Sequence, residues 1–191
     1  SGHPTRDESL LLQLPGPTAG AAFGPRPPLM IAFHSFSRSE KEPFNGSDLP
    51  EECAARGWML LAPLGLSQIN FASPATMEAL DATLSVIGQL APFDRKRVFT
   101  AGFSMGGAGA MGYAIRKQDP AQLRVAGVVC HTGTMEVREA VEGYLANLEA
   151  AASGPFATPA QIAEFNLVKD EFVLLFGDLP ANAPFIGAAI I

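Results

Sequence analysis

The glycine-rich stretch from Val98 to Tyr113, VFTAGFSMGGAGAMGY, constrains the fold more than any other part of the sequence. It begins with a short apolar run, which is typical of a buried strand. Glycines lie two residues before and two residues after Ser104, and the glycines that follow at 107, 109 and 112 let a helix pack closely on a sheet. A strand, a tight turn and a helix in direct succession predict an α/β protein with a parallel sheet.

The rest of the chain alternates between apolar runs and helical patterns, as this class of fold requires. Short continuous runs such as LMIAF are typical of strands that are buried on both faces. Strands are expected over 29–33, 58–62, 98–101, 125–130 and 172–176, with a further edge strand over 10–14. Helices are expected over 51–56, from the N-cap Ser73 and Pro74 onward, over 108–117 and over 136–152.

Two known signatures overlap in the glycine-rich stretch. Residues 107–112 fit G-x-G-x-x-G, which binds dinucleotides when its first glycine follows a strand directly. Here that glycine comes six residues after the expected strand end at Ala101, where the helix should already have begun. The next strand ends in Cys130-His131-Thr132, without the acidic residue that binds the ribose. The sequence therefore disfavours a nucleotide cofactor.

Residues 102–106 fit the other signature, G-x-S-x-G, in its proper context. Ser104 would occupy a strained turn between strand and helix, which requires small residues at Gly102 and Gly106. The backbone N–H of Met105 would then point at an oxyanion beside the helix N-terminus. A glycine-rich turn with an incidental serine is the alternative, and it is disfavoured because strand, turn and helix come in the required order.

At this point the sequence resembles the α/β-hydrolase superfamily, and within it the carboxylesterase, dienelactone-hydrolase and polyester-depolymerase-like branch. The matching segments are LMIAFHSFS at 29–37, RGWMLLAPLG at 56–65 and DRKRVFTAGFSMGG at 94–107. The resemblance implies an α/β-hydrolase fold, with a mostly parallel sheet and helices on both faces. It also implies a serine hydrolase that cleaves carboxylic esters through an acyl-enzyme on Ser104.

The same resemblance implies roles for residues outside the turn. A second oxyanion donor belongs in the loop after the strand 29–33, where the N–H of Ser35 or Phe36 would join that of Met105. His34 in this loop would be structural. The acid of the family follows the strand expected at 172–176, which points to Asp178.

The general base is the difficulty, because the family order is serine, acid, histidine and no histidine follows Asp178. His131 ends the strand after the helix, on the same rim as Ser104, and is a substitute base. Three explanations stay open. The chain is a shortened or altered hydrolase without its last strand and helix, a short member with another base, or a hydrolase-fold binding protein with impaired or lost catalysis. Apart from the question of the base, transfer of an acyl group in place of hydrolysis is a further functional alternative.

The chain is expected to form a single domain over residues 1–191. Residues 132–166 are longer than a plain crossover needs, so they form either a crossover with an extra helix or a cap-like insertion of the kind common in the family. A mostly apolar acyl or aryl pocket is expected from rim residues Phe36, Phe44, Ile69, Phe71 and Met105.

The remaining expectations concern partners and compartment. The net charge of −6 and the scattered basic residues disfavour nucleic acid, and no apolar stretch reaches the roughly 20 residues of a membrane span. The histidines lack metal-ligand spacing, so neither a metal nor a cofactor is expected. The partner is a small-molecule or polymeric ester, and missing edge elements would favour a homo-oligomer. Cys53 and Cys130 are expected as free, buried thiols. The compartment stays open between the cytoplasm and a secreted mature form.

Overall fold

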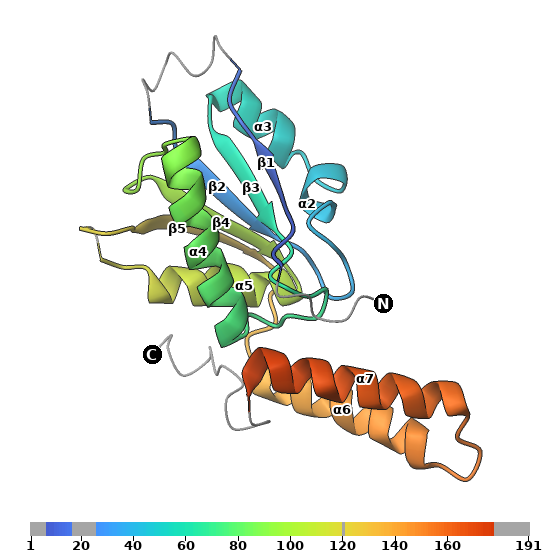
Figure 1. The fold of residues 1–191 in the computed structure, drawn as a ribbon. Helices are drawn as coiled ribbons and strands as arrows, with labels where there is room; N and C mark the ends of the chain where they lie inside the picture. Colours follow the sequence, from blue (N-terminus) through green and yellow to red (C-terminus); the bar gives the residue numbers. More distant parts are fainter. Residues whose placement is uncertain (1–6, 17–25, 120, 178–191) are drawn as a thin grey trace.

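The computed structural model describes residues 7–16, 26–119 and 121–177, and its centre is a five-stranded sheet (Figure 1). The strands lie in the order β1-β3-β2-β4-β5, and β1 is antiparallel to its neighbour while the others run parallel. They are β1 (Leu10–Gln13), β2 (Leu29–Phe33), β3 (Met59–Pro63), β4 (Val98–Phe103) and β5 (Val125–His131). All five positions were expected from the sequence.

Six helices complete the described part of the chain. They are α2 (Glu42–Asn45), α3 (Leu49–Arg56), α4 (Pro74–Leu90), α5 (Met105–Arg116), α6 (Val137–Ser153) and α7 (Pro159–Phe176). The helices α4 and α5 share the larger core with one face of the sheet, and α3 packs with the smaller core on the other face. The alternation along β2 shows this division, because Ile31 joins the larger core and Met30 the smaller one.

The start of α4 follows the expected capping chemistry. The Ser73 hydroxyl accepts a hydrogen bond from the Thr76 N–H at 3.2 Å, and Pro74 occupies the first turn. Met77, Leu80, Leu84 and Ile87 are buried at helical spacing. Helix α4 therefore presents one apolar stripe to the larger core.

The strand expected at 172–176 is wrong, because these residues form the last turns of α7. Helix α7 begins at a capping box, in which Thr158 and Gln161 exchange side-chain and backbone hydrogen bonds. Its buried residues Val168, Phe172, Leu175 and Phe176 are spaced by four, three and one, as one face of a helix requires. The helices α6 and α7 thus form a hairpin that projects from the carboxyl end of the sheet (Figure 1).

Strand β5 lies at the edge of the described sheet, where β4 is its one neighbour. Cys130 on this strand is exposed, which corrects the expectation of a buried thiol, whereas Cys53 in α3 is buried. Burial raises the pKa of the Cys53 thiol to about 11, so it stays protonated at neutral pH. Both cysteines are free.

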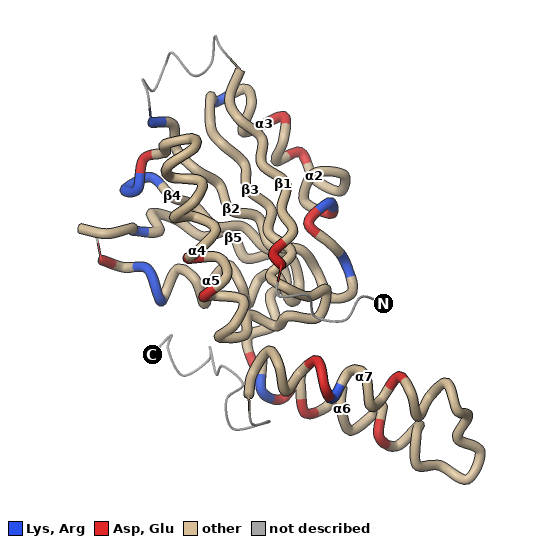
Figure 2. Tube along the Cα trace, in the orientation of Figure 1, with Lys and Arg blue, Asp and Glu red and all other residues tan. Residues whose placement is uncertain are grey.

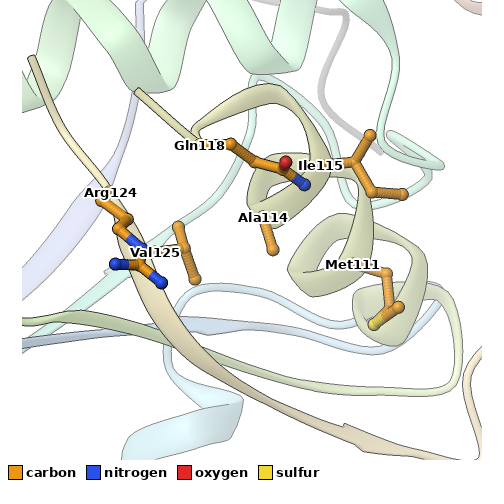
Figure 3. Close-up of a pocket in the computed structure, with 6 residues that line it drawn as sticks. All are labelled: Met111, Ala114, Ile115, Gln118, Arg124 and Val125. Carbon is orange, nitrogen blue, oxygen red and sulfur yellow. The ribbon is translucent and has the colours of Figure 1, made fainter. Parts of the chain in front are cut away.

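A pocket of about 480 Å³ opens between the carboxyl-terminal half of α5 and the start of β5 (Figure 3). Its walls are Met111, Ala114, Ile115, Gln118, Arg124 and Val125. Because Val125 begins β5 and Ser104 follows the end of β4, the pocket lies at the opposite end of the sheet from Ser104. It is therefore separate from the candidate active site.

The described residues include no helix that is long and apolar enough to cross a membrane. Within the same residues, no group of histidine, cysteine and acidic side chains is arranged to hold a metal ion. Figure 2 shows Lys and Arg near the amino ends of β4 and β5 and beside α2, while acidic residues predominate on the α6–α7 hairpin.

Candidate active site

Ser104 stands alone between β4 and α5, in a backbone conformation that L-residues rarely adopt. Its φ is 51° and its ψ is −119°, and the residue is exposed. Five other described non-glycine residues have positive φ, all in loops at or near the carboxyl ends of strands: Ser37, Leu66, Phe71, Ala72 and Thr132. Backbone strain thus gathers on the side of the sheet where Ser104 lies.

The two flanking glycines make this turn feasible. A Cβ atom on Gly102 would lie 1.9 Å from the carbonyl oxygen of Gly106. A Cβ atom on Gly106 would lie 2.4 Å from the carbonyl oxygen of Phe33 and 2.6 Å from that of His34. The sequence argument for small residues at these positions therefore has a direct steric basis. The absence of a side chain at Gly106 also lets the end of β2 lie directly against the first turn of α5.

The G-x-G-x-x-G signature lies inside α5, because the helix begins at Met105. The glycines serve close packing there. A Cβ atom on Gly107 would lie 2.5 Å from the Cα of Gly133, and one on Gly109 would lie 2.7 Å from the ring of Phe33. The signature therefore does not form the strand-to-helix loop that a dinucleotide needs.

Two backbone N–H groups remain as anion donors near the turn. The N–H of Met105 is in the first turn of α5, where helical residues have no partner within the helix. In the loop after β2, the N–H of Ser35 already donates to the Glu42 carboxylate at 2.5 Å. The N–H of Phe36 makes no hydrogen bond within the described residues, so it is the donor of this loop that is available to a ligand.

His34 is buried, with 2% of its surface exposed. Its Nδ1 lies 2.8 Å from the carbonyl oxygen of Ser35, and its Nε2 lies 2.8 Å from that of Leu64. Asn70 adds an amide nitrogen 3.2 Å from Nε2. The ring thus joins the loops after β2 and β3, which is a structural arrangement.

His131 is exposed at the end of β5 and is adjacent to the turn through its backbone. The Ser104 N–H donates to the His131 carbonyl oxygen at 3.0 Å. The imidazole ring lies against Phe103, with ring centroids 5.6 Å apart, and its Nδ1 is 3.4 Å from the Thr132 hydroxyl. No described residue makes a hydrogen bond to the Ser104 hydroxyl.

The other site residues expected from the sequence are not all found at the rim of the sheet. Asp178 lies outside the described residues, and the segment before it is a helix rather than the expected strand. Phe44 packs against the smaller core on the far face of the sheet, so it does not line the rim. Ile69, Phe71 and Met105 are buried in the larger core, whereas Phe36 is half-buried.

Two carboxylates that the sequence did not single out organise the loops around the site. Glu42 holds the Ser35 N–H, and Glu8 accepts hydrogen bonds from the N–H groups of Gly65 and Leu66 at 2.8 and 2.9 Å. Burial raises the pKa of Glu8, although these backbone hydrogen bonds oppose the rise. Glu8 and Gly65 are 57 positions apart, so no local pattern could have indicated the contact.

No model of a known protein family matches the sequence, and no curated protein matches it either. Solved structures do match. FphF, a fluorophosphonate-binding serine hydrolase of Staphylococcus aureus, matches with a TM-score of 0.57 and 17% identity over 85% of this chain and 68% of its own. The S-formylglutathione hydrolase FrmB of the same organism matches with a TM-score of 0.56 and 16% identity over 86% of this chain and 69% of its own.

An S-formylglutathione hydrolase from Agrobacterium tumefaciens matches with a TM-score of 0.55 and 14% identity, over 80% of this chain and 57% of its own. The chain therefore spans between 57% and 69% of the length of these three proteins. At such low identities the likeness concerns the fold. The strand order, the turn at Ser104 and these matches together show that the chain has the α/β-hydrolase fold.

Proposed function

We propose that this protein cleaves carboxylic esters through an acyl-enzyme on Ser104. The observation that carries the proposal is the turn itself: an exposed serine with positive φ between β4 and the N-terminus of α5. A strained turn of this kind presents a hydroxyl above the sheet and beside unpaired helix N–H groups. The serine hydrolases among the structural matches agree with this reaction class.

In the proposed reaction, the Ser104 Oγ attacks the ester carbonyl and its proton passes to a base. The negative charge that develops on the carbonyl oxygen is stabilised by the N–H groups of Met105 and Phe36. Collapse of the tetrahedral intermediate expels the alcohol, which takes up the proton from the base. Water then attacks the acyl-enzyme in the same way, and the acid leaves.

His131 is the candidate base within the described residues. The described histidines are His34 and His131, and both ring nitrogens of His34 face backbone carbonyl oxygens in the protein interior. His131 is exposed and starts from a backbone position that is bonded to Ser104. Its ring makes no hydrogen bond to the Ser104 hydroxyl in the structure, so the proposed proton transfer requires the His131 side chain to turn toward Ser104.

A binding protein on the same fold is the second candidate function. The specific observation in its favour is that the Ser104 hydroxyl has no hydrogen-bond partner among the described residues. A serine without a base is a poor nucleophile.

Intact-mass measurement after reaction with a fluorophosphonate probe separates the two functions. We expect one adduct on the wild-type chain, none on Ser104→Ala, and labelling of His131→Gln that is slower by about 100-fold or more. Labelling of His131→Gln at the wild-type rate would remove His131 from the mechanism. A wild-type chain that takes up no probe would favour the binding protein.

The charge near the site favours neutral esters. Glu136 and Glu139 flank Arg138 at the start of α6, and acidic residues predominate along the α6–α7 hairpin (Figure 2). This segment adjoins the serine turn, because the Thr134 N–H donates to the Ser104 carbonyl oxygen at 3.0 Å. An acidic surface repels a substrate that carries a carboxylate. We expect acyl esters without charge to be cleaved faster than matched esters with a free carboxylate. The difference should shrink as salt is added, because salt screens exposed charges.

A further inference from the structure

The α6–α7 hairpin reaches the loop that carries Phe36. The Phe36 ring packs edge-on against Tyr144 of α6, with ring centroids 5.0 Å apart, and it lies 5.5 Å from the ring of Phe71. Phe172 of α7 lies behind both partners, at 6.0 Å from Phe71 and 6.1 Å from Tyr144. Phe172 is fully buried, so Phe36 rests on a packed aromatic cluster that the hairpin supplies in part.

Hydrogen bonds connect the same loop to α7 by a second route. The Ser37 N–H donates to the Gln68 carbonyl oxygen at 2.9 Å, which joins the loop after β2 to the loop after β3. The hydroxyl of Ser67, which is 4% exposed, donates to the Glu171 carboxylate of α7. The backbone around Phe36 is therefore held by the hairpin through both ring contacts and hydrogen bonds.

The segment that leads into the hairpin also contacts the serine turn. The Thr134 N–H donates to the Ser104 carbonyl oxygen at 3.0 Å, just before α6 begins. One structural unit thus contacts the two chain segments that carry the proposed oxyanion donors, Phe36 and Met105. The mutual placement of those donors depends on how the hairpin docks.

We propose that the α6–α7 hairpin is a positioning element for the oxyanion site, and that Tyr144 is the residue through which it fixes the Phe36 N–H. Tyr144 acts through Phe36 and does not touch the reacting atoms, so it is a positioning residue. This inference rests on the proposed ester hydrolysis and deepens it. It assigns a specific task to the hairpin, which overlaps residues 132–166, the stretch expected from the sequence as a crossover with an extra helix or a cap-like insertion, and continues to Phe176.

The test compares Tyr144→Ala with two matched variants. Tyr144→Phe keeps the ring against Phe36, and Leu148→Ala removes a similar apolar contact one turn later in α6. We expect Tyr144→Ala to lower kcat by about 10- to 100-fold, because a shift of about 1 Å in a positioned group has effects of this size. KM should change by less than about threefold, since the lost interaction is made only in the transition state. Tyr144→Phe and Leu148→Ala should keep the wild-type kcat.

Amide hydrogen exchange of residues 35–38 provides the second readout and does not depend on activity. We expect faster exchange in Tyr144→Ala than in Leu148→Ala at equal protein stability. Unchanged exchange in Tyr144→Ala, or an equal loss of kcat in Leu148→Ala, would overturn the inference. Failure of the proposed function looks different, because a wild-type chain without probe adduct or turnover would still show whether Tyr144 orders this loop.

Discussion

Ser104 combines an exposed hydroxyl with a backbone conformation that costs free energy of folding. A positive φ in a residue with a Cβ atom costs about 1–3 kcal/mol, and it persists only where the surroundings hold it in place. Here the Ser104 N–H donates one hydrogen bond and the Ser104 carbonyl oxygen accepts two, from Gly107 and Thr134. Gly102 and Gly106 provide the space that the turn needs. The strain belongs to the site, because a relaxed turn would no longer lift the hydroxyl above the sheet.

Replacing Ser104 by glycine should therefore stabilise the fold relative to alanine. We expect Ser104→Gly to have a higher free energy of unfolding than Ser104→Ala, by about 0.5–1 kcal/mol, since glycine adopts positive φ without strain. Urea denaturation of the two variants measures the difference. Equal stability, or a more stable alanine variant, would show that Ser104 carries no strain.

The serine turn was predictable from the sequence because its requirements are local. Gly102, Ser104 and Gly106 lie within five positions, and a Cβ atom on either glycine would clash with neighbouring backbone atoms. The loop chemistry around the turn was not predictable. The Glu42 carboxylate accepts the hydrogen bond of the Ser35 N–H, whereas the Phe36 N–H has no partner among the described residues. This difference depends on how α2 packs against the loop, which no local sequence pattern indicates.

Among the elements, helix α7 is stabilised by the capping box at its N-terminus. Thr158 accepts a hydrogen bond from the Gln161 N–H, and the Gln161 side chain accepts one from the Thr158 N–H. We expect Thr158→Ala to lower the free energy of unfolding by about 1 kcal/mol, the usual effect of a lost N-cap. Thermal unfolding followed by circular dichroism measures it. Ser85→Ala, at an exposed position inside α4, is the matched control and should have little effect.

The same cap explains why one expected strand was wrong. A run such as FVLLF is equally consistent with a buried strand and with a buried helix segment, because periodicity cannot separate them at that length. The sequence TPAQ at 158–161 is a capping box with proline at the first helical position, and it predicts the helix that continues into the run. The strands expected at 29–33 and 98–101 are both present, although the second extends to Phe103. They were predictable because each is a short apolar run that is bounded by clear breaks.

At the scale of the whole molecule, Asp81 of α4 connects this helix to the end of α5 through hydrogen bonds and ion pairs. Its carboxylate accepts hydrogen bonds from the Tyr113 hydroxyl at 2.9 Å and from Lys117 at 2.9 Å, and Arg116 lies 3.3 Å away. Partial burial acts to raise the pKa of Asp81. The hydrogen bonds from Lys117 and Tyr113, with the charges of Lys117 and Arg116, outweigh it and hold that pKa below its ordinary value.

A lowered pKa in the folded state gives stability that is present above the unfolded pKa of about 3.9 and is lost as the pH falls through the folded value. We expect Asp81→Ala to lower the free energy of unfolding by about 1–3 kcal/mol at pH 7, because the buried Tyr113 hydroxyl loses its acceptor. The difference from the wild type should narrow below about pH 4. Urea denaturation across this pH range measures both effects.

Glu52→Ala is the control for the charge network. Glu52 pairs with Arg56 on the surface of α3, where the two side chains are 57% and 56% exposed. Such a pair contributes about 0.5 kcal/mol or less. A loss in Glu52→Ala as large as that in Asp81→Ala would contradict a special role for the α4–α5 contact.

The projecting shape of the α6–α7 hairpin (Figure 1) affects how the protein should respond to heat. Its tip stands in solvent, with Phe156 93% exposed, and its buried anchors Val137, Val141, Val168 and Phe172 belong to the larger core. A unit attached in this way can detach without melting the sheet, since parts of a protein open with different free energies. The proposed hydrolysis would then cease, reversibly, at a temperature below the main unfolding transition, and cooling would restore it.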